Sequence, residues 1–294
     1  MPLFGQIVVG PAGCGKSAFC AAASTVFETN LRRKIRVINL DPGADRIVYE
    51  RNCDADIRTL TNVDEVMQSQ HLGPNGALMY SMELLCNNLN WFNENIEAVD
   101  SDYYIFDCPG QVELFVHSGS MQKIIKYLID TFDFRLCVVF LVDCQFATDI
   151  MKFTSSVLCA FSCMAHFELP HFNVISKIDK LDENEKKFLY KILSSIDSSS
   201  LTEMLEDPSY KSYMSNLTPF KLYEEMHSAF ILKLANVLDQ YDYVSFSLIS
   251  AKKSKTIMNL LTSIDLVLQY DEFREVRERD TDANEEGNAG EMQI

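Results

Sequence analysis

Residues 10–17 read Gly-Pro-Ala-Gly-Cys-Gly-Lys-Ser and fit the pattern G-x-x-x-x-G-K-[ST]. The apolar run 6–9 precedes this stretch, and the helix-compatible run 18–26 follows it. In such a strand, turn and helix, the backbone N–H groups of the turn can wrap a phosphate, and the helix N-terminus adds positive potential. The stretch therefore predicts an α/β fold around a phosphate-binding loop, and this context disfavours a merely structural glycine-rich turn.

The residues of this loop have separate expected roles. Lys16 should reach the outer phosphates of a nucleotide, and the Ser17 hydroxyl should hold Mg²⁺. The other expected contacts to phosphate come from the loop and the first helical turn, at Gly13, Cys14, Gly15 and Ala18.

Short apolar runs alternate with longer helix-compatible stretches along the whole chain. The runs cover residues 6–9, 36–40, 103–106, 136–142, 173–175 and 244–249. Most are unbroken rather than alternating, which is typical of strands covered on both faces. The pattern predicts a mostly parallel central sheet flanked by helices, in one P-loop domain over residues 1–270.

Two regions depart from this rhythm. Residues 181–240 contain no convincing strand, and apolar side chains recur every three or four positions over 222–241. We expect a helical insertion whose apolar stripe is core, with a partner-binding groove as the alternative. Residues 271–294 carry nine acidic and three basic residues, which predicts an acidic disordered tail.

The composition disfavours several classes of function. The 294 residues hold 26 basic and 42 acidic side chains, a net charge of −16. This excess disfavours direct binding to nucleic acid and docking on anionic membranes, but it allows a small anionic ligand in a local pocket. The sequence shows no membrane span and no secretory signal. Nine cysteines without a CxxC pair indicate reduced cytosolic thiols rather than zinc ligands.

A second motif, Asp-Cys-Pro-Gly-Gln, follows the apolar run 103–106. A strand that ends in Asp-x-x-Gly is the metal-side motif of P-loop proteins. Asp107 would hold Mg²⁺ through water, and the Gly110 N–H would sense the γ-phosphate. Gln111 and Glu113 follow at once and are candidates to orient a water molecule.

A third motif, Ser-Lys-x-Asp, follows the run 173–175 and points to guanine. A carboxylate at Asp179 can accept hydrogen bonds from both N1–H and the 2-amino group of guanine, and adenine lacks that pair of donors. Lys177 would lie over the base with its aliphatic stem. Ser176 stands where GTPases usually carry Asn, and Ala251, after the last strand, would close on the guanine oxygen.

With these motifs in this order, the sequence resembles the GPN-loop GTPase family. The decisive residues are Gly-Pro-Asn at 73–75, between the phosphate loop and the Asp107 strand, where that family carries its namesake insertion. Other similar stretches lie at residues 39–42, 56–58, 87–91, 107–114 and 140–143. The similarity runs from Phe4 to about residue 270 and is greatest to the shorter eukaryotic paralogues, numbered two and three, with a lean to two.

The resemblance implies a GTPase that converts GTP to GDP and phosphate with Mg²⁺ and acts as a dimer. Asp41 matches the acid that positions Mg²⁺ or the attacking water, and Asn75 would act near the partner's nucleotide. The resemblance implies a homodimer or a heterodimer with a paralogue, and a role in assembly or nuclear import of RNA polymerases through polymerase subunits or assembly factors. It also implies a cytoplasmic location with shuttling to the nucleus. The family usually has Ala and Glu where this chain has Gly43 and Asp45.

Two other classes of function stay open. A small-molecule kinase shares the phosphate loop, but it usually carries an Arg-rich lid and needs neither Lys177 nor Asp179. A nucleotide-dependent assembly scaffold with little turnover is the other alternative, and the intact catalytic candidates Lys16 and Gln111 argue against it. Asp143 ends a strand and is either an acid of the inner site or a helix cap.

Overall fold

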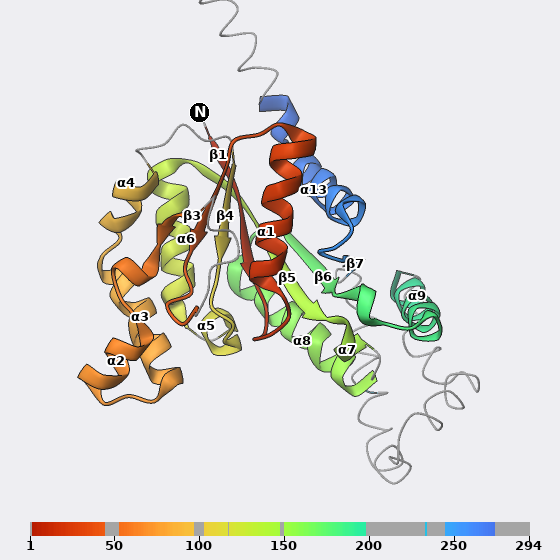
Figure 1. The fold of residues 1–294 in the computed structure, drawn as a ribbon, viewed down its shortest axis with the longest axis horizontal. Helices are drawn as coiled ribbons and strands as arrows, with labels where there is room; N and C mark the ends of the chain where they lie inside the picture. Colours follow the sequence, from red (N-terminus) through yellow and green to blue (C-terminus); the bar gives the residue numbers. More distant parts are fainter. Residues whose placement is uncertain are drawn as a thin grey trace, which may run out of the picture.

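The computed structural model of the chain describes residues 2–44, 53–96, 103–116, 118–147, 150–197, 233 and 245–273. Its centre is a sheet of seven strands in the order β3-β2-β4-β1-β5-β6-β7, in which every neighbouring pair is parallel (Figure 1). The strands are β1 (Leu3–Val9), β2 (Ile35–Asn39), β3 (Cys53–Asp56), β4 (Tyr103–Asp107), β5 (Phe134–Asp143), β6 (His171–Ser176) and β7 (Phe246–Leu248). This arrangement confirms the predicted α/β fold with a mostly parallel sheet.

The central strands are buried on both faces, which explains why their sequences are apolar without alternation. Successive side chains of a strand point to opposite faces of the sheet. In β1, Ile7 and Val9 belong to one apolar cluster, whereas Val8 belongs to the other. All three side chains are at most 1% exposed. Each cluster therefore lies between the sheet and a separate layer of helices.

Helices cover the two faces unequally (Figure 1). On one face, α1 and α13 pack against the sheet through residues such as Phe19 and Leu261. The other face is covered by a larger set of helices, whose packing includes Phe92, Leu128 and Phe153. The first layer is α1 (Lys16–Val26) and α13 (Ser254–Leu268), and the second includes α3 (Pro74–Asn87), α4 (Asn90–Ile96), α5 (Val112–Val116), α6 (Gly119–Phe132), α7 (Cys144–Ala147) and α8 (Ile150–Phe167). Helix α2 (Val63–Gln70) packs on α3.

Strand β3 is an addition to the strands expected from the sequence. It lies at the edge of the sheet and pairs only with β2 among the described residues. Its four residues read Cys-Asp-Ala-Asp, so it offers no apolar run to mark it. An edge strand contributes less to the core, and tertiary pairing rather than sequence pattern defines it.

Parts of the expected organisation lie outside the described residues. Helix α9 (Glu183–Asp197) opens the region predicted as a helical insertion. Residues 198–232 and 234–244 are not described, nor are residues 274–294 of the predicted tail. The division at residue 270 stays a prediction, although the described chain continues to Phe273, whose ring lies 5.9 Å from that of Phe4.

Three features of the described residues concern membrane, thiol and metal chemistry. No helix in the described part of the chain has the length and apolar character needed to cross a membrane. The nine cysteines all occur as free thiols. Within the described ranges, no group of three or more His, Cys, Asp or Glu side chains is arranged to bind a metal.

Candidate active site

The predicted site residues gather at the carboxyl edge of the sheet. The loop after β1 carries Lys16, and β4 ends at Asp107. In open parallel sheets, ligands bind outside the carboxyl ends of the strands, where neighbouring connections run to opposite faces. Other predicted residues lie at the same edge. Asp143 and Ser176 end β5 and β6, and the residues that follow β2, β6 and β7 are Asp41, Lys177, Asp179 and Ala251.

The phosphate loop, residues 10–17, is shaped by glycine backbones. Gly10 has φ 146°, and a Cβ at this position would lie 2.3 Å from the Leu141 carbonyl oxygen of β5. Gly15 has φ 95° and immediately precedes the first residue of α1. Both conformations strain any residue with a side chain. The loop therefore turns sharply between β1 and α1 and leaves the helix N-terminus at the sheet edge, as an anion site requires.

Lys16 is folded back over this loop. Its side chain is buried, and Nζ donates hydrogen bonds to the carbonyl oxygens of Gly10 at 3.1 Å and Pro11 at 3.3 Å. Gly110, after β4, lies against the same loop, because a Cβ there would be 2.9 Å from both Lys16 Nζ and Ala12 Cα. The two predicted phosphate contacts are thus brought together, and only glycine fits beside the ammonium group.

Two carboxyl groups and this ammonium all influence the buried thiol of Cys108. Asp107 ends β4 and is 2% exposed, and its carbonyl oxygen accepts a hydrogen bond from the Leu40 N–H at 2.8 Å. Burial raises the pKa of the Cys108 thiol well above its usual value; the charges of Asp107 and Asp41 raise it further, and Lys16 lowers it. Asp107, Asp41 and Lys16 therefore all act on the Cys108 thiol at the carboxyl edge of the sheet. Ser17, at the start of α1, is half-buried.

Asn75 and Gln111 contact each other within one chain. Gln111 Nε2 donates a hydrogen bond to Asn75 Oδ1 at 2.5 Å. Asn75 is exposed in the first turn of α3, which begins with Pro74. Glu113 is exposed in the first turn of α5. The structure thus joins the Gly-Pro-Asn segment to the residue predicted to orient water, while the action of Asn75 across a dimer stays a prediction.

The base end, which comprises Ser176, Lys177, Asp179, Ser250 and Lys252, is tied to the phosphate loop. Ser176 Oγ is 2.6 Å from the Cys14 carbonyl oxygen, to which it donates. Lys177 has φ 60°, and its Nζ donates to the Gly13 carbonyl oxygen. A hydroxyl at position 176 therefore makes the loop contact itself, even though Asn is the usual residue there.

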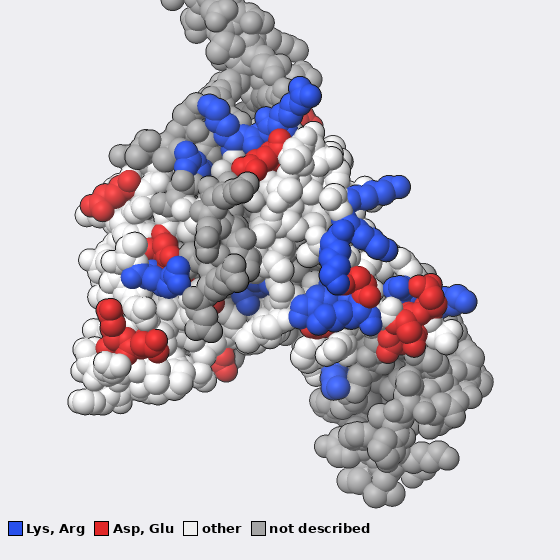
Figure 2. Space-filling view, viewed as in Figure 1, with Lys and Arg blue, Asp and Glu red and all other residues white. Residues whose placement is uncertain are grey.

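Both oxygens of Asp179 are engaged by residues that follow β7. Ser250 Oγ donates to Oδ1 at 2.8 Å, and Lys252 Nζ lies 2.7 Å from Oδ2. The hydrogen bonds from Lys252 and Ser250 lower the pKa of Asp179 to about 2. Ala251 is exposed between these two residues. Basic side chains gather around the start of α13, beside this carboxylate, although the chain is acidic overall (Figure 2).

Comparison with known proteins agrees with this geometry. A family model described as "Conserved hypothetical ATP binding protein" matches residues 8–270. The chain is 38% identical to the protein named GPN-loop GTPase 3 of Xenopus tropicalis, over 97% of this chain and 95% of that protein. It is 36% identical to the protein of the same name from Saccharomyces cerevisiae, over 95% and 97%. The chain belongs to the GPN-loop GTPase family. The name of both relatives carries the number three, so neither supports a lean to paralogue two.

A solved structure has the same fold as this GPN-loop family member. The crystal structure of a GTPase in apo form from Pyrococcus abyssi superposes with a TM-score of 0.69. The match covers 88% of this chain and 95% of that chain, at 24% sequence identity. The description of the family model mentions ATP, whereas the names of the relatives mention GTP. The residues of the base end therefore carry the information on which nucleotide base this chain prefers.

The structure assigns Asp143 two contacts that sequence reasoning left open. Its Oδ1 accepts a hydrogen bond from the Gln145 N–H at 3.0 Å and so caps α7. Its Oδ2 lies 2.6 Å from Lys177 Nζ. Burial alone would raise the pKa of Asp143, but the hydrogen bonds from Lys177 and Gln145 leave it lowered. The position of Asp143 at a strand end hinted at both contacts, but only the fold brings β6 beside it.

Proposed function

We propose that this chain binds GTP together with Mg²⁺ and hydrolyses it to GDP and phosphate. The observation that carries the proposal is the Lys177 side chain, which spans from the base end to the Gly13 carbonyl oxygen of the phosphate loop. A nucleotide laid along this lysine would have its base near Asp179 and its phosphates near Lys16. The base-reading and phosphate-binding elements therefore form one continuous site.

The base end supports guanine over adenine. The Asp179 carboxylate is ionised across the physiological pH range, because even the ordinary pKa of an aspartate lies well below that range and the hydrogen bonds from Lys252 and Ser250 lower it further. An ionised carboxylate only accepts hydrogen bonds, so it suits the N1–H and 2-amino donors of guanine. Adenine presents an acceptor at N1 and would leave Asp179 without that pair. The phosphate loop is common to proteins that bind ATP and proteins that bind GTP. We therefore infer that this chain prefers GTP, even though the description of the family model mentions ATP.

The residues at the phosphate end fit a magnesium ion. Mg²⁺ prefers hard oxygen ligands and commonly takes one or two carboxylates together with substrate phosphates. The Ser17 hydroxyl and the carboxylates of Asp107 and Asp41 supply such oxygens. The charges of both acids and of Lys16 all act on the buried Cys108 thiol, which supports a shared site for these groups. When bound, Mg²⁺ would neutralise charge on the phosphate oxygens.

The chain's own groups account for the remaining steps of hydrolysis. The Lys16 ammonium and the N–H groups of the loop would stabilise charge on the γ-phosphate as its bond to the leaving oxygen breaks. The Gly110 N–H, which lies after β4 and beside Lys16, would contact the same phosphate. Gln111 and Glu113 would hold the attacking water in line with that bond.

We further propose that the active form is a dimer, either of two copies or with a paralogue. The α2–α3 segment supports this, because Leu72, Met79 and Tyr80 are 36–41% exposed around the exposed Asn75. The proposed cellular role is assembly or nuclear import of RNA polymerases, in the cytoplasm and with shuttling, through polymerase subunits or assembly factors. Family membership supports this role.

Phosphate release by the purified full chain tests the proposed function. GTP should be hydrolysed faster than ATP, with a requirement for Mg²⁺ and with no added acceptor. The Asp107→Asn variant should lose this activity, whereas Lys126→Ala, an exposed position on α6, should keep it. A requirement for a small-molecule acceptor would instead indicate a kinase, and nucleotide binding without single-turnover hydrolysis would indicate a scaffold. Sedimentation with and without GTP tests the dimer.

A further inference from the structure

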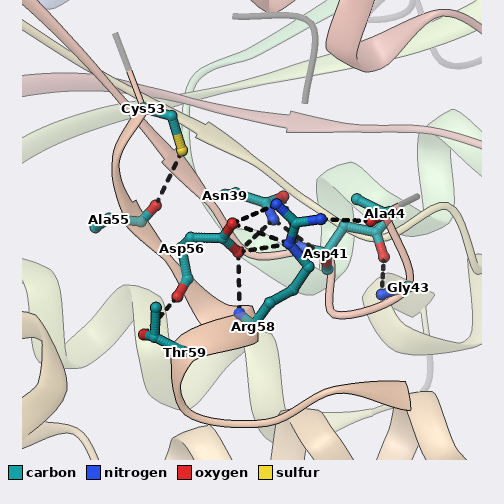
Figure 3. A network of polar contacts seen from close by, with 9 residues as sticks. All are labelled: Asn39, Asp41, Gly43, Ala44, Cys53, Ala55, Asp56, Arg58 and Thr59. Atoms are coloured by element: carbon teal, nitrogen blue, oxygen red, sulfur yellow. Dashed lines mark hydrogen bonds and ion pairs between the residues drawn. The ribbon is translucent and has the colours of Figure 1, made fainter. Parts of the chain in front are cut away.

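Three polar side chains surround the loop that carries Asp41, and we call them the loop clamp: Asn39, Asp56 and Arg58. Asn39 ends β2 and Asp56 ends β3, whereas Arg58 lies in the 3-10 turn Ile57–Thr59 that follows. Figure 3 shows the three side chains converging beside residues 41–44. The clamp thus joins the two outermost strands on this side of the sheet to the segment that carries a proposed catalytic acid.

Asn39 holds the backbone of Asp41 from two sides. Its Oδ1 accepts a hydrogen bond from the Asp41 N–H at 3.1 Å, and its Nδ2 donates to the Asp41 carbonyl oxygen at 3.2 Å. The same Nδ2 donates to Asp56 Oδ1 at 2.8 Å. The Asn39 side chain is fully buried, so its amide cannot exchange these partners for water.

Asp56 is the centre of the clamp. Its carboxylate accepts hydrogen bonds from the Arg58 backbone N–H at 2.9 Å, from Asn39, and from the Arg58 guanidinium at distances down to 2.6 Å. Burial by itself raises the pKa of Asp56, but the hydrogen bonds from Arg58 and Asn39 outweigh burial and leave the pKa lowered. The carboxylate therefore stays charged and fixes the guanidinium in one orientation.

Arg58 extends the clamp to Ala44. Its Nε and one terminal nitrogen pair with Asp56, and the other terminal nitrogen donates to the Ala44 carbonyl oxygen at 2.9 Å (Figure 3). The planar fork of arginine can make these contacts together, whereas the single ammonium of lysine cannot. The clamp therefore holds residues 41–44 at both ends.

If the clamp were purely structural, it would need only to hold the edge strand β3 in the sheet. Holding this edge strand needs only the bonds between Asn39, Asp56 and Arg58. The bonds to Asp41 and Ala44 go beyond that need, because they reach the backbone of residues 41–44, which follow β2. The Asp41 carboxylate turns back to accept the Gly43 N–H at 2.9 Å.

We propose that Asn39, Asp56 and Arg58 are positioning residues that set the place of Asp41 at the phosphate end. This inference rests on the proposed function, because Asp41 is a candidate ligand of Mg²⁺ or of the attacking water. A glycine at position 43 loosens the backbone, so a loop of this sequence depends more on outside contacts for its position. The clamp supplies those contacts through the backbone of Asp41 and Ala44.

The test compares Arg58→Ala, Arg58→Lys and Asp56→Asn with the matched control Lys126→Ala. Hydrogen exchange of the nucleotide-free chain should quicken about tenfold in the peptide that contains residues 41–44 in Arg58→Ala. Arg58→Lys should exchange at an intermediate rate, because it keeps a charge near Asp56 and loses the bond to Ala44. Lys126→Ala should exchange as the natural chain does.

Nucleotide measurements then separate positioning from folding. GDP affinity without Mg²⁺ should stay within about twofold, whereas the Mg²⁺ concentration needed for tight GDP binding should rise several-fold. The single-turnover rate should fall roughly 10- to 100-fold, as expected when a reacting group is misplaced by about 1 Å. Unchanged exchange at 41–44, or quicker exchange with unchanged Mg²⁺ requirement and rate, would overturn the proposal.

Two further outcomes are covered by the same set of variants. If Arg58→Ala does not fold, Arg58→Lys and Asp56→Asn carry the comparison, since Arg58→Lys keeps a positive charge beside Asp56 and Asp56→Asn keeps the size of the side chain. If the natural chain hydrolyses no GTP, the proposed function fails, and hydrogen exchange together with the Mg²⁺ requirement for GDP binding still decides whether the clamp positions Asp41.

Discussion

The phosphate end of the site is formed mainly by backbone groups, whereas the base end is formed mainly by side chains. At the phosphate end, glycine backbones shape the loop, and Lys16 is 8% exposed and bonded to main-chain carbonyl oxygens. At the base end, side chains do the work, and Lys252 is 80% exposed in its pair with Asp179. Backbone geometry is fixed before a ligand arrives, whereas exposed ion pairs exchange readily with solvent and ligand. Affinity should therefore reside at the phosphate end and specificity at the base end.

The largest expected effect is that of Lys16→Ala. Removal of the ammonium should weaken binding of GTP and GDP by roughly 100- to 1000-fold, the size expected for two charge-assisted hydrogen bonds to phosphate. Fluorescence titration with a labelled guanine nucleotide measures the change, with Lys126→Ala as the control for loss of one charge. An effect smaller than that of any base-end variant would break the comparison.

Asp179→Asn should change specificity more than it changes binding to the loop. An amide at this position presents a donor to the N1–H of guanine, so GTP affinity should fall roughly 10- to 100-fold. Xanthosine triphosphate, which offers an oxygen in place of the 2-amino group, should gain affinity. Competition between GTP and xanthosine triphosphate measures the change in preference. A GTP affinity equal to that of the natural chain would contradict recognition of guanine by Asp179.

Asp143→Asn tests whether the two ends are coupled. The ion pair with Lys177 is partly buried, with side chains 13% and 27% exposed, and it steers the lysine that contacts Gly13. Loss of the charge should weaken GDP affinity by roughly three- to tenfold, while the cap of α7 is largely kept by the isosteric amide. Isothermal titration checks the affinity, and thermal unfolding should change little. A loss limited to thermal stability would make Asp143 a helix cap alone.

The smallest expected effect has the opposite sign. Lys252 occupies Asp179 Oδ2, an atom that guanine needs, so Lys252→Met should strengthen GDP binding by roughly two- to fivefold. The gain should shrink at high salt, because salt already screens an exposed pair. Titration at two ionic strengths measures both. Weaker binding in the variant would show that Lys252 contacts the nucleotide instead of competing with it for Asp179.

Local motifs predicted one part of the site well. The phosphate loop at residues 10–17 is fixed by torsions that its own glycines allow, so its shape could be predicted from the sequence. Strands β1, β4, β5 and β6 were marked by apolar runs, because both faces of the sheet are covered. The residues that end these strands, such as Asp107, then had to meet at one edge.

Other parts depended on pairings between distant segments. Strand β3 has no apolar run, so the clamp residues Asp56 and Arg58 could be noticed as a family-like stretch but not given a role. The bond between Asn75 and Gln111 joins positions 36 residues apart, and that between Asp179 and Ser250 joins positions 71 apart. Spacing along the chain says nothing about such contacts.

By itself, the sequence determined the fold class and a phosphate-binding loop, because both follow from short-range rules: apolar runs bury, and glycines permit turns that other residues resist. It also named most residues of the base end. Only the tertiary structure decided which contacts these residues make: Lys252 pairs with Asp179, Asp143 pairs with Lys177, and the clamp holds the loop of Asp41. Those contacts arise where parallel strands bring their ends together, and the order of strands in the sheet is a property of the whole fold.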